Sequence, residues 1–271
     1  MKNNKGLFKI IALVMAIGLI GAILFVTNSF IGNPVSASFA KKAAKKHIEK
    51  NYSDLDLIIE KPRYNFKFGE YIVKASSKTS IDTHFNIYYR NGQIRYDDYD
   101  SYVLGKFNTL SRLQEECANL VRPILSEVQG LESNRTMVLV EKWEYEQKNG
   151  AIQLDMNFDR SLPVDMQITL QSDLENPSLK NVAHLLETAH HLLTNHGFKF
   201  TSYHLYSEHK DILLMVDGVQ PADIESGNLE SLLEDALNYE DKDEDYDVEK
   251  GEDKPEAPER IRVFIKDGRT Q

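Results

Sequence analysis

The sequence predicts an α+β protein, with an N-terminal transmembrane helix followed by two small α+β domains with antiparallel sheets. Three observations lead to this fold class. Residues 10–32 form an uncharged apolar run, several short segments alternate apolar and polar residues as strands do, and longer segments repeat apolar residues at helical spacing. About 235 residues follow the run, and a chain of this length forms one large domain or, more typically, two ordinary ones.

The apolar run is long enough to cross a membrane. It follows a basic tail at residues 1–9 that carries three lysines. Because a helix rises about 1.5 Å per residue, residues 10–32 would reach about 34 Å, which exceeds a hydrocarbon layer about 30 Å thick. A long secretory signal segment is the alternative, since the Val-Ser-Ala sequence at 35–37 resembles a cleavage site. The run exceeds the usual core of a cleaved signal, which favours a retained anchor.

Two groups of lysines compete to set the orientation of this segment. Lys9 lies directly beside the apolar run, whereas five lysines lie beyond it, between residues 41 and 50. Positive charge favours the cytoplasmic side, and the second group begins about nine residues past the run, on a predicted helix. We therefore expect the N-terminus inside, a single pass through the cell membrane, and an extracytoplasmic body. No cysteine follows the run in a lipoprotein-like position, so a lipid anchor is not indicated.

The acidity of the chain is concentrated in one segment. The net charge is −10, and residues 230–259 contain 14 acidic residues against three lysines, which gives −11 and leaves about +1 for the rest. Nucleic acid is not expected as a partner, because no basic stripe with interleaved aromatic residues occurs in the body. The single cysteine, Cys117, cannot form an internal disulfide, and its place on an apolar helical stripe indicates a small buried side chain.

Residues 38–129 are predicted to form the first α+β domain. Its first helix would place alanines and an isoleucine on one face, which would pack on a sheet. Strand patterns follow between residues 55 and 96, and Asn91 and Gly92 join two of them. Asn-Gly is the strongest short hairpin signal, because a type I′ turn needs positive φ at both central residues. A helix from about 108 to 128 closes the domain.

Residues 136–271 are predicted to form the second α+β domain. The expected elements are strands at 137–145, 152–158 and 164–170, a helix from Asn176 to Gly197, strands at 198–206 and 212–216, a helix at 228–239 and a strand at 261–265. The first three strands would form a meander. Asn176 and Pro177 are typical of a helix start, and Gly197 is typical of a helix end. Residues 240–259 would be an acidic loop of about 20 residues, longer than ordinary connections.

This acidic loop holds the candidate metal site. Six carboxylates occupy positions 1, 3, 5, 7, 9 and 12 of a calcium-loop register, namely Asp241, Asp243, Asp245, Asp247, Glu249 and Glu252. An EF-hand needs glycine at position 6 for a sharp turn, and that residue here is Tyr246. Because such a register arises easily by chance in an acidic run, a solvated flexible loop is the default interpretation and calcium the alternative.

Other candidates for chemistry are weaker. His184, Glu187 and His191 are spaced to share one helix face, but that face lies opposite the apolar stripe, and exposed polar residues explain it without a metal. The sequence contains no Gly-x-Ser-x-Gly, Walker, Gly-x-Gly-x-x-Gly or His-Glu-x-x-His motif. We therefore assign no catalytic or cofactor-binding residue. The many aromatic residues between 64 and 99 are interpreted as sheet core rather than as a ligand-binding face.

Several strings of residues resemble a known family. They are Gly32–Ser36 after the apolar run, Ala40–Ala44, Tyr64–Gly69, Ser80–Phe85, Leu154–Phe158 with Leu162–Val164, and the helix end at Ala189–Gly197. With these strings the chain is similar to the YfjL-like proteins of Gram-positive bacteria over most of its length. The resemblance implies a two-domain exported or anchored protein, and it implies no reaction and no catalytic residue. The acidic stretch at 240–259 departs from the pattern.

The sequence thus favours a membrane-anchored extracytoplasmic protein that is a non-catalytic binding or interaction module of the cell envelope. Its partners would be the membrane, through residues 10–32, and an envelope protein or a small molecule. The alternatives are a calcium-dependent or metal-dependent cell-surface enzyme and a purely structural spacer. Thermal unfolding with added calcium would distinguish the calcium-dependent enzyme from the other two hypotheses, because a ligand that binds only the folded state raises the unfolding temperature.

Overall fold

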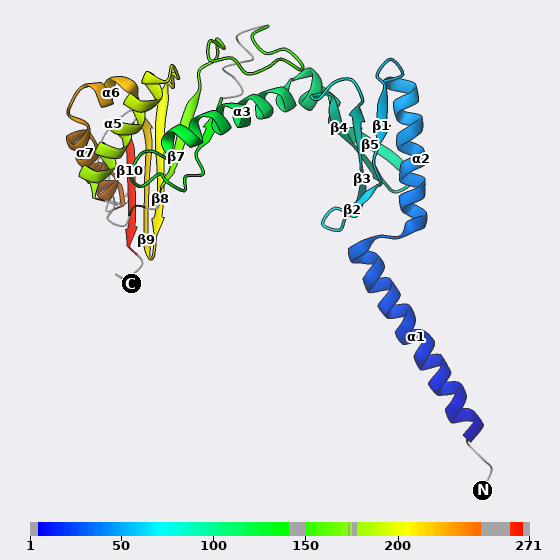
Figure 1. The fold of residues 1–271 in the computed structure, drawn as a ribbon. Coiled ribbons are helices and arrows are strands. Elements are labelled where there is room, and N and C mark those ends of the chain that lie inside the picture. The colour runs from blue at the N-terminus through cyan, green and yellow to red at the C-terminus, as the bar shows by residue number, and fades with distance from the viewer. Residues whose placement is uncertain (1–4, 141–149, 173, 175–177, 245–260, 268–271) are drawn as a thin grey trace, which may run out of the picture. The chain divides into compact units, whose positions relative to one another are not determined.

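The computed structural model describes residues 5–140, 150–172, 174, 178–244 and 261–267. It is a mixed α+β structure that divides into two compact units, Met1–Thr109 and Leu110–Gln271 (Figure 1). Each unit contains one sheet and one hydrophobic core. The predicted fold class, an apolar N-terminal helix followed by two α+β domains, is therefore confirmed.

Helix α1, Lys5–Ile31, contains the apolar run. Its 27 residues correspond to about 40 Å, and those whose burial is described are exposed to solvent along its length. By length and composition it can cross a membrane. The helix ends at Gly32, whose φ of +74° is the left-handed conformation that commonly terminates helices.

Helix α2, Pro34–Asn51, begins two residues after Gly32 and four before the expected start of the first domain at residue 38. The side chain of Asn33 caps it by accepting a hydrogen bond from the Ser36 N–H at 2.7 Å, and Pro34 occupies the first turn. This strong start signal explains the earlier beginning. The buried face consists of Ala40, Ala44 and Ile48, and it packs on the first sheet.

The first sheet is antiparallel throughout. Its strands are β1 (Leu57–Ile59), β2 (Arg63–Asn65), β3 (Glu70–Ser77), β4 (His84–Arg90) and β5 (Gln93–Asp97). Strands β1 and β2 pair with the same edge of β3, and β4 and β5 follow on its other side. The β4–β5 turn has φ of 51° at Asn91 and 83° at Gly92, so the predicted type I′ hairpin is confirmed.

The boundary between the units differs from the expected one at residue 129. A short π-helix, η1 (Asp100–Leu104), leads into helix α3 (Phe107–Leu125). The apolar face of α3, including Leu113, Val121 and Leu125, belongs to the core of the second unit. The boundary therefore lies between Thr109 and Leu110. Helical periodicity marks an apolar face but does not say which sheet covers it.

The second sheet has the order β10-β9-β8-β7-β6. Its strands are β6 (Met137–Leu139), β7 (Gln167–Ser172), β8 (Ser202–His209), β9 (Ile212–Val219) and β10 (Arg262–Asp267). All neighbours are antiparallel except β7 and β8, which are parallel because helix α5 crosses between them. The final strand returns to the sheet as predicted.

The predicted meander at the start of this unit is wrong. Residues 152–158 contain no strand, and a turn with φ of +61° at Asp155 interrupts them. Ile152 is nevertheless buried in the core, so its apolar character reflects packing without strand pairing. The expected strand at 137–145 ends at Leu139 within the described residues, and 141–149 lie outside them.

Three helices gather beside the second sheet (Figure 1). They are α5 (Leu179–Asn195), α6 (Pro221–Glu225) and α7 (Leu229–Glu244). Helix α5 is capped by the side chain of Ser178 rather than by Asn176, which lies outside the described residues together with Pro177. Gly197 follows its end with φ of +79°, as predicted. Helix α7 continues five residues beyond its expected end at 239.

Candidate functional site

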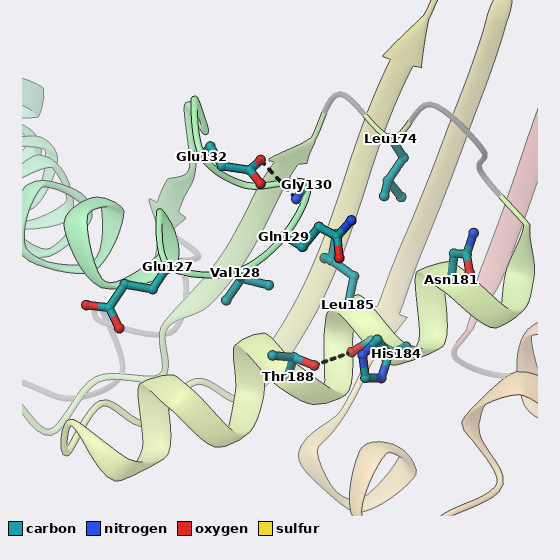
Figure 2. A pocket seen from close by; sticks show the side chains of 10 residues that line it. All are labelled: Glu127, Val128, Gln129, Gly130, Glu132, Leu174, Asn181, His184, Leu185 and Thr188. Atoms are coloured by element: carbon teal, nitrogen blue, oxygen red, sulfur yellow. Dashed lines mark hydrogen bonds between the residues drawn. The ribbon is translucent and has the colours of Figure 1, made fainter.

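A cavity of about 580 Å³ lies in the second unit, between the start of helix α5 and the turn that follows helix α3. Figure 2 shows the side chains that line it. They are Glu127, Val128, Gln129, Gly130, Glu132, Leu174, Asn181, His184, Leu185 and Thr188. A volume of this size is within the range of small-molecule sites. It is a candidate binding site of this unit.

Two leucines that line the cavity pack closely against Gly130. Its φ is +89°, and a Cβ added there would lie 3.1 Å from a methyl of Leu174 and 3.4 Å from a methyl of Leu185. The Gly130 N–H donates a hydrogen bond to the Glu132 carboxylate at 2.9 Å, as Figure 2 shows. Ser172 is buried beside this glycine, and its hydroxyl has no hydrogen-bond partner among the described residues.

Some polar groups of the lining are engaged within the protein. Glu132 is occupied by the backbone of its own turn, and the Thr188 hydroxyl donates to the His184 carbonyl at 2.7 Å. No nucleophile lies within hydrogen-bond reach of a base among the described residues that line the cavity. The glutamates give the lining negative charge, while Leu174, Leu185 and Val128 give it an apolar surface.

The fold places the histidines of helix α5 in different environments. His190 is buried, with Nδ1 2.9 Å from the Tyr203 hydroxyl and Nε2 3.3 Å from a Glu225 carboxylate oxygen. Burial and the Glu225 charge raise the pKa of Tyr203, which keeps its hydroxyl neutral. His184 and His191 are exposed. In the described part of the chain no three acidic, histidine or cysteine side chains group as metal ligands would.

A polar cluster in the first unit joins helix α2 to strand β5. His47 Nε2 lies 2.6 Å from an Asp97 carboxylate oxygen, and the Tyr52 hydroxyl donates to both oxygens of Asp97 at 3.0 Å. Burial, followed by the Asp97 hydrogen bond and charge, raises the pKa of Tyr52. Asp97 also accepts the Tyr99 N–H at 3.1 Å, so its oxygens are engaged both with residues of helix α2 and its C-cap and with the turn that follows β5.

A second cavity lies where helix α1 meets the first sheet. Its volume is about 250 Å³, and its lining includes Asn28, Gly32, Tyr64, Tyr71 and Arg90. The Asn33 N–H donates to the Tyr71 hydroxyl at 2.7 Å, and that hydroxyl donates to the Asn33 carbonyl at 3.0 Å. A Cβ at Gly32 would lie only 2.6 Å from the same hydroxyl. We call this arrangement of Gly32, Asn33, Tyr64 and Tyr71 the anchor junction.

Sequence reasoning missed both cavities. Neither is lined by a motif, and each depends on residues that are distant in the sequence. The glycines at positions 32 and 130 were a signal for these places in the fold, because a positive φ and close packing of neighbouring side chains on the backbone both select glycine. Cys117 behaves as interpreted, since it is fully buried and burial raises the pKa of its thiol to about 12.

The acidic candidate site falls largely outside the described residues. Helix α7 runs through Glu244, so Asp241 and Asp243 belong to its last turns. Asp245, Asp247, Glu249 and Glu252 lie in the undescribed range 245–260. The calcium hypothesis therefore stays a prediction.

The aromatic residues of the first sheet fall into two groups. Phe85 and Tyr89 are buried in the core, as the sheet-core interpretation expects. Tyr88 and Tyr96 stack on each other across β4 and β5, with ring centroids 4.3 Å apart, and Tyr96 is more than half exposed. Cross-strand aromatic pairs stabilise sheets, so the stacked pair has a structural role without a ligand.

Comparison with known proteins places both units in one family. The model of the YfjL-like N-terminal domain matches residues 7–98, and the model of the YfjL-like C-terminal domain matches residues 116–234. The gap between the two matches contains the boundary found in the structure, between Thr109 and Leu110. No curated protein and no solved structure matches the chain.

Proposed function

The chain belongs to the YfjL-like family, and on that premise we propose that it is a single-pass membrane protein with an extracytoplasmic body that binds a cell-envelope component without catalysis. The observation that carries the proposal is helix α1. Most of the side chains of this 27-residue helix whose burial is described are apolar and exposed, and lipid is the medium that suits such a surface. A basic start to the chain and the charge-free run favour the N-terminus inside.

The anchor junction supports retention of α1 over cleavage as a signal segment. The sequence that resembles a cleavage site, residues 35–37, lies in the first turn of helix α2. Cleavage after Ala37 would remove the Asn33 cap and leave the Tyr71 hydroxyl without either of its partners. Loss of a helix cap alone costs about 1 kcal/mol. A retained anchor keeps all of these contacts.

The cavity beside helix α5 supports a binding role. Its lining combines an apolar floor with glutamate, asparagine and histidine side chains, which is the usual composition of a ligand site. Glu127 and Glu132 are acidic, and the described lining contains no lysine or arginine. A ligand that carries positive charge or several hydrogen-bond donors fits this lining best.

Two measurements test the anchor and its orientation. N-terminal sequencing of the native protein is expected to find residues 1–32 still attached. Protease added to intact cells is expected to digest the body, because the body would lie outside the cytoplasm. A mature chain that begins near residue 38 would overturn the retained anchor. Protection of the body in intact cells with digestion after lysis would overturn the orientation.

Site-specific photo-crosslinking tests the cavity. A photoreactive residue at Gln129, which lines the cavity, is expected to give a covalent adduct in native membranes. The matched control is the same residue at Lys199, which is exposed and outside the cavity. Adducts at Gln129 alone support a ligand site there. Adducts at neither position, or equally at both, would overturn it and leave the anchored structural spacer as the better function.

A further inference from the structure

The turn between strands β2 and β3 exposes two phenylalanines in a defined conformation. The Gly69 N–H donates to the Asn65 carbonyl at 2.9 Å, and the Lys67 N–H donates to the Asn65 side chain at 3.2 Å. These bonds close the turn with Phe66 54% exposed and Phe68 60% exposed. Two large aromatic side chains held close together in water by one ordered turn form an apolar patch, and moving such a patch out of water lowers the free energy.

This turn lies at the end of helix α1. The rings of Phe66 and Phe30 are in contact, with centroids 5.7 Å apart. Figure 1 likewise shows β2 at the end of the first unit where α1 joins. Phe30 is the second-last residue of α1, and the uncharged run ends at Gly32. If the run crosses the membrane, Phe30 lies at the boundary between the hydrocarbon and the headgroups, and Phe66 must lie at the same depth.

The anchor junction makes this placement specific. Gly32 packs against Tyr64 and Tyr71 so closely that a Cβ would not fit, and Asn33 is hydrogen-bonded to Tyr71. The end of α1 is therefore attached to the strands on both sides of the turn. The contact between Phe30 and Phe66 is therefore fixed by packing, because no flexible linker separates the end of α1 from these strands.

Charge on this end of the unit complements a lipid surface. Lys67 lies between the two phenylalanines, and Arg63 precedes them on β2. Arg90 lines the cavity beside Asn28 of α1. All three are exposed, and within the described residues none makes an ion pair. Cations beside interfacial aromatic residues favour anionic headgroups.

From this geometry we infer that the first unit is seated on the lipid surface through the Phe66–Gly69 turn, with Phe66 and Phe68 inserted at the level of Phe30. Aromatic side chains are enriched at this level in membrane proteins. The seat gives the unit a second attachment beside α1 and fixes its orientation on the bilayer. The inference rests on the proposed anchoring and adds a contact that anchoring alone does not require.

Spin labelling of the full chain in anionic vesicles tests the seat. Single cysteines replace Phe68, Ile81 and Leu19 in turn, and the buried Cys117 thiol does not compete for the label. Ile81 is the matched control, since it is a turn residue 67% exposed at the other end of β3. The ratio of collisions with oxygen to collisions with a water-soluble nickel complex is expected to be several-fold higher at 68 than at 81.

The label at residue 19 separates the two hypotheses. A lipid-like ratio at 19 with a water-like ratio at both 68 and 81 would overturn the seat and leave the anchor intact. A water-like ratio at 19 would overturn the anchor, and the seat with it. Within the seat, Lys67→Glu is expected to lower the ratio at 68 in anionic vesicles more than in neutral ones. An equal change of the ratio in anionic and neutral vesicles would show that charge does not contribute to the seat.

Discussion

The two units differ in how many apolar side chains they bury. Among the described residues, the core of the second unit contains 34 buried hydrophobic residues, and the core of the first contains ten, three of them alanines. The first unit instead relies on polar contacts of tyrosine hydroxyls, such as Tyr71 with the backbone of Asn33 and Tyr52 with the carboxylate of Asp97. Small cores supply little stabilisation, so specific polar contacts carry more of the first unit's stability. The second unit should tolerate changes in pH better and truncation of core side chains worse.

The largest expected effect is truncation in the second core. Leu186 on helix α5 is fully buried, and Leu186→Ala is expected to lower the free energy of unfolding by about 2–5 kcal/mol, because a cavity remains where the side chain was. Denaturant unfolding followed by circular dichroism measures it. Leu120→Ala is the control, since that side chain is 46% exposed. Equal losses in both variants would contradict the packing described.

The next effect concerns the anchor junction. Gly32→Ala is expected to destabilise the first unit by more than the 1–3 kcal/mol that backbone strain at positive φ costs, because Tyr64 and Tyr71 must also move. Gly92→Ala is the matched control, with φ of +83° and nothing within 4 Å of its Cβ. The difference between the unfolding temperatures of the two variants measures the cost of moving Tyr64 and Tyr71. Identical shifts would show that Gly32 is required for its φ alone.

A smaller effect is expected from alkaline pH in the first unit. Burial, followed by the charge and hydrogen bond of Asp98, raises the pKa of Tyr88 to about 12. Because the neutral tyrosine is favoured in the folded state, its contribution to stability is complete below pH 10 and is lost as the pH rises through about 12. Tyr88→Phe should therefore lose less stability than the natural chain between pH 10 and 12. Parallel pH profiles of the two proteins would contradict this.

The smallest expected effect is that of calcium. Asp241 and Asp243 lie in helix α7, whereas an EF-hand takes its ligands from a loop, and Tyr246 stands where that loop needs glycine. Millimolar calcium is expected to leave the unfolding temperature unchanged. A rise that disappears in the double variant Asp241→Asn and Asp243→Asn would instead establish the site. Magnesium at the same ionic strength controls for screening.

The elements that the sequence predicts correctly are those whose signals are local. The Asn91-Gly92 turn follows from the φ that its residues adopt, and the end of helix α5 at Gly197 follows from the same rule. The strand expected at 152–158 failed because alternating apolar residues also occur in irregular segments that pack on a core. Neither candidate cavity was predictable, since the residues that line each one come from separate elements.

The sequence by itself determined the apolar helix α1 and the presence of two α+β units, because composition and periodicity are properties of short stretches. The family was indicated separately, by the resemblance of several strings of residues. The tertiary structure alone decided that α3 belongs to the second core, since an apolar helical face is the same whichever sheet covers it. It also decided how α1 meets the first sheet. The contacts of Gly32 with Tyr71 and of Phe30 with Phe66 join residues more than 35 positions apart, and only the folded chain brings them together.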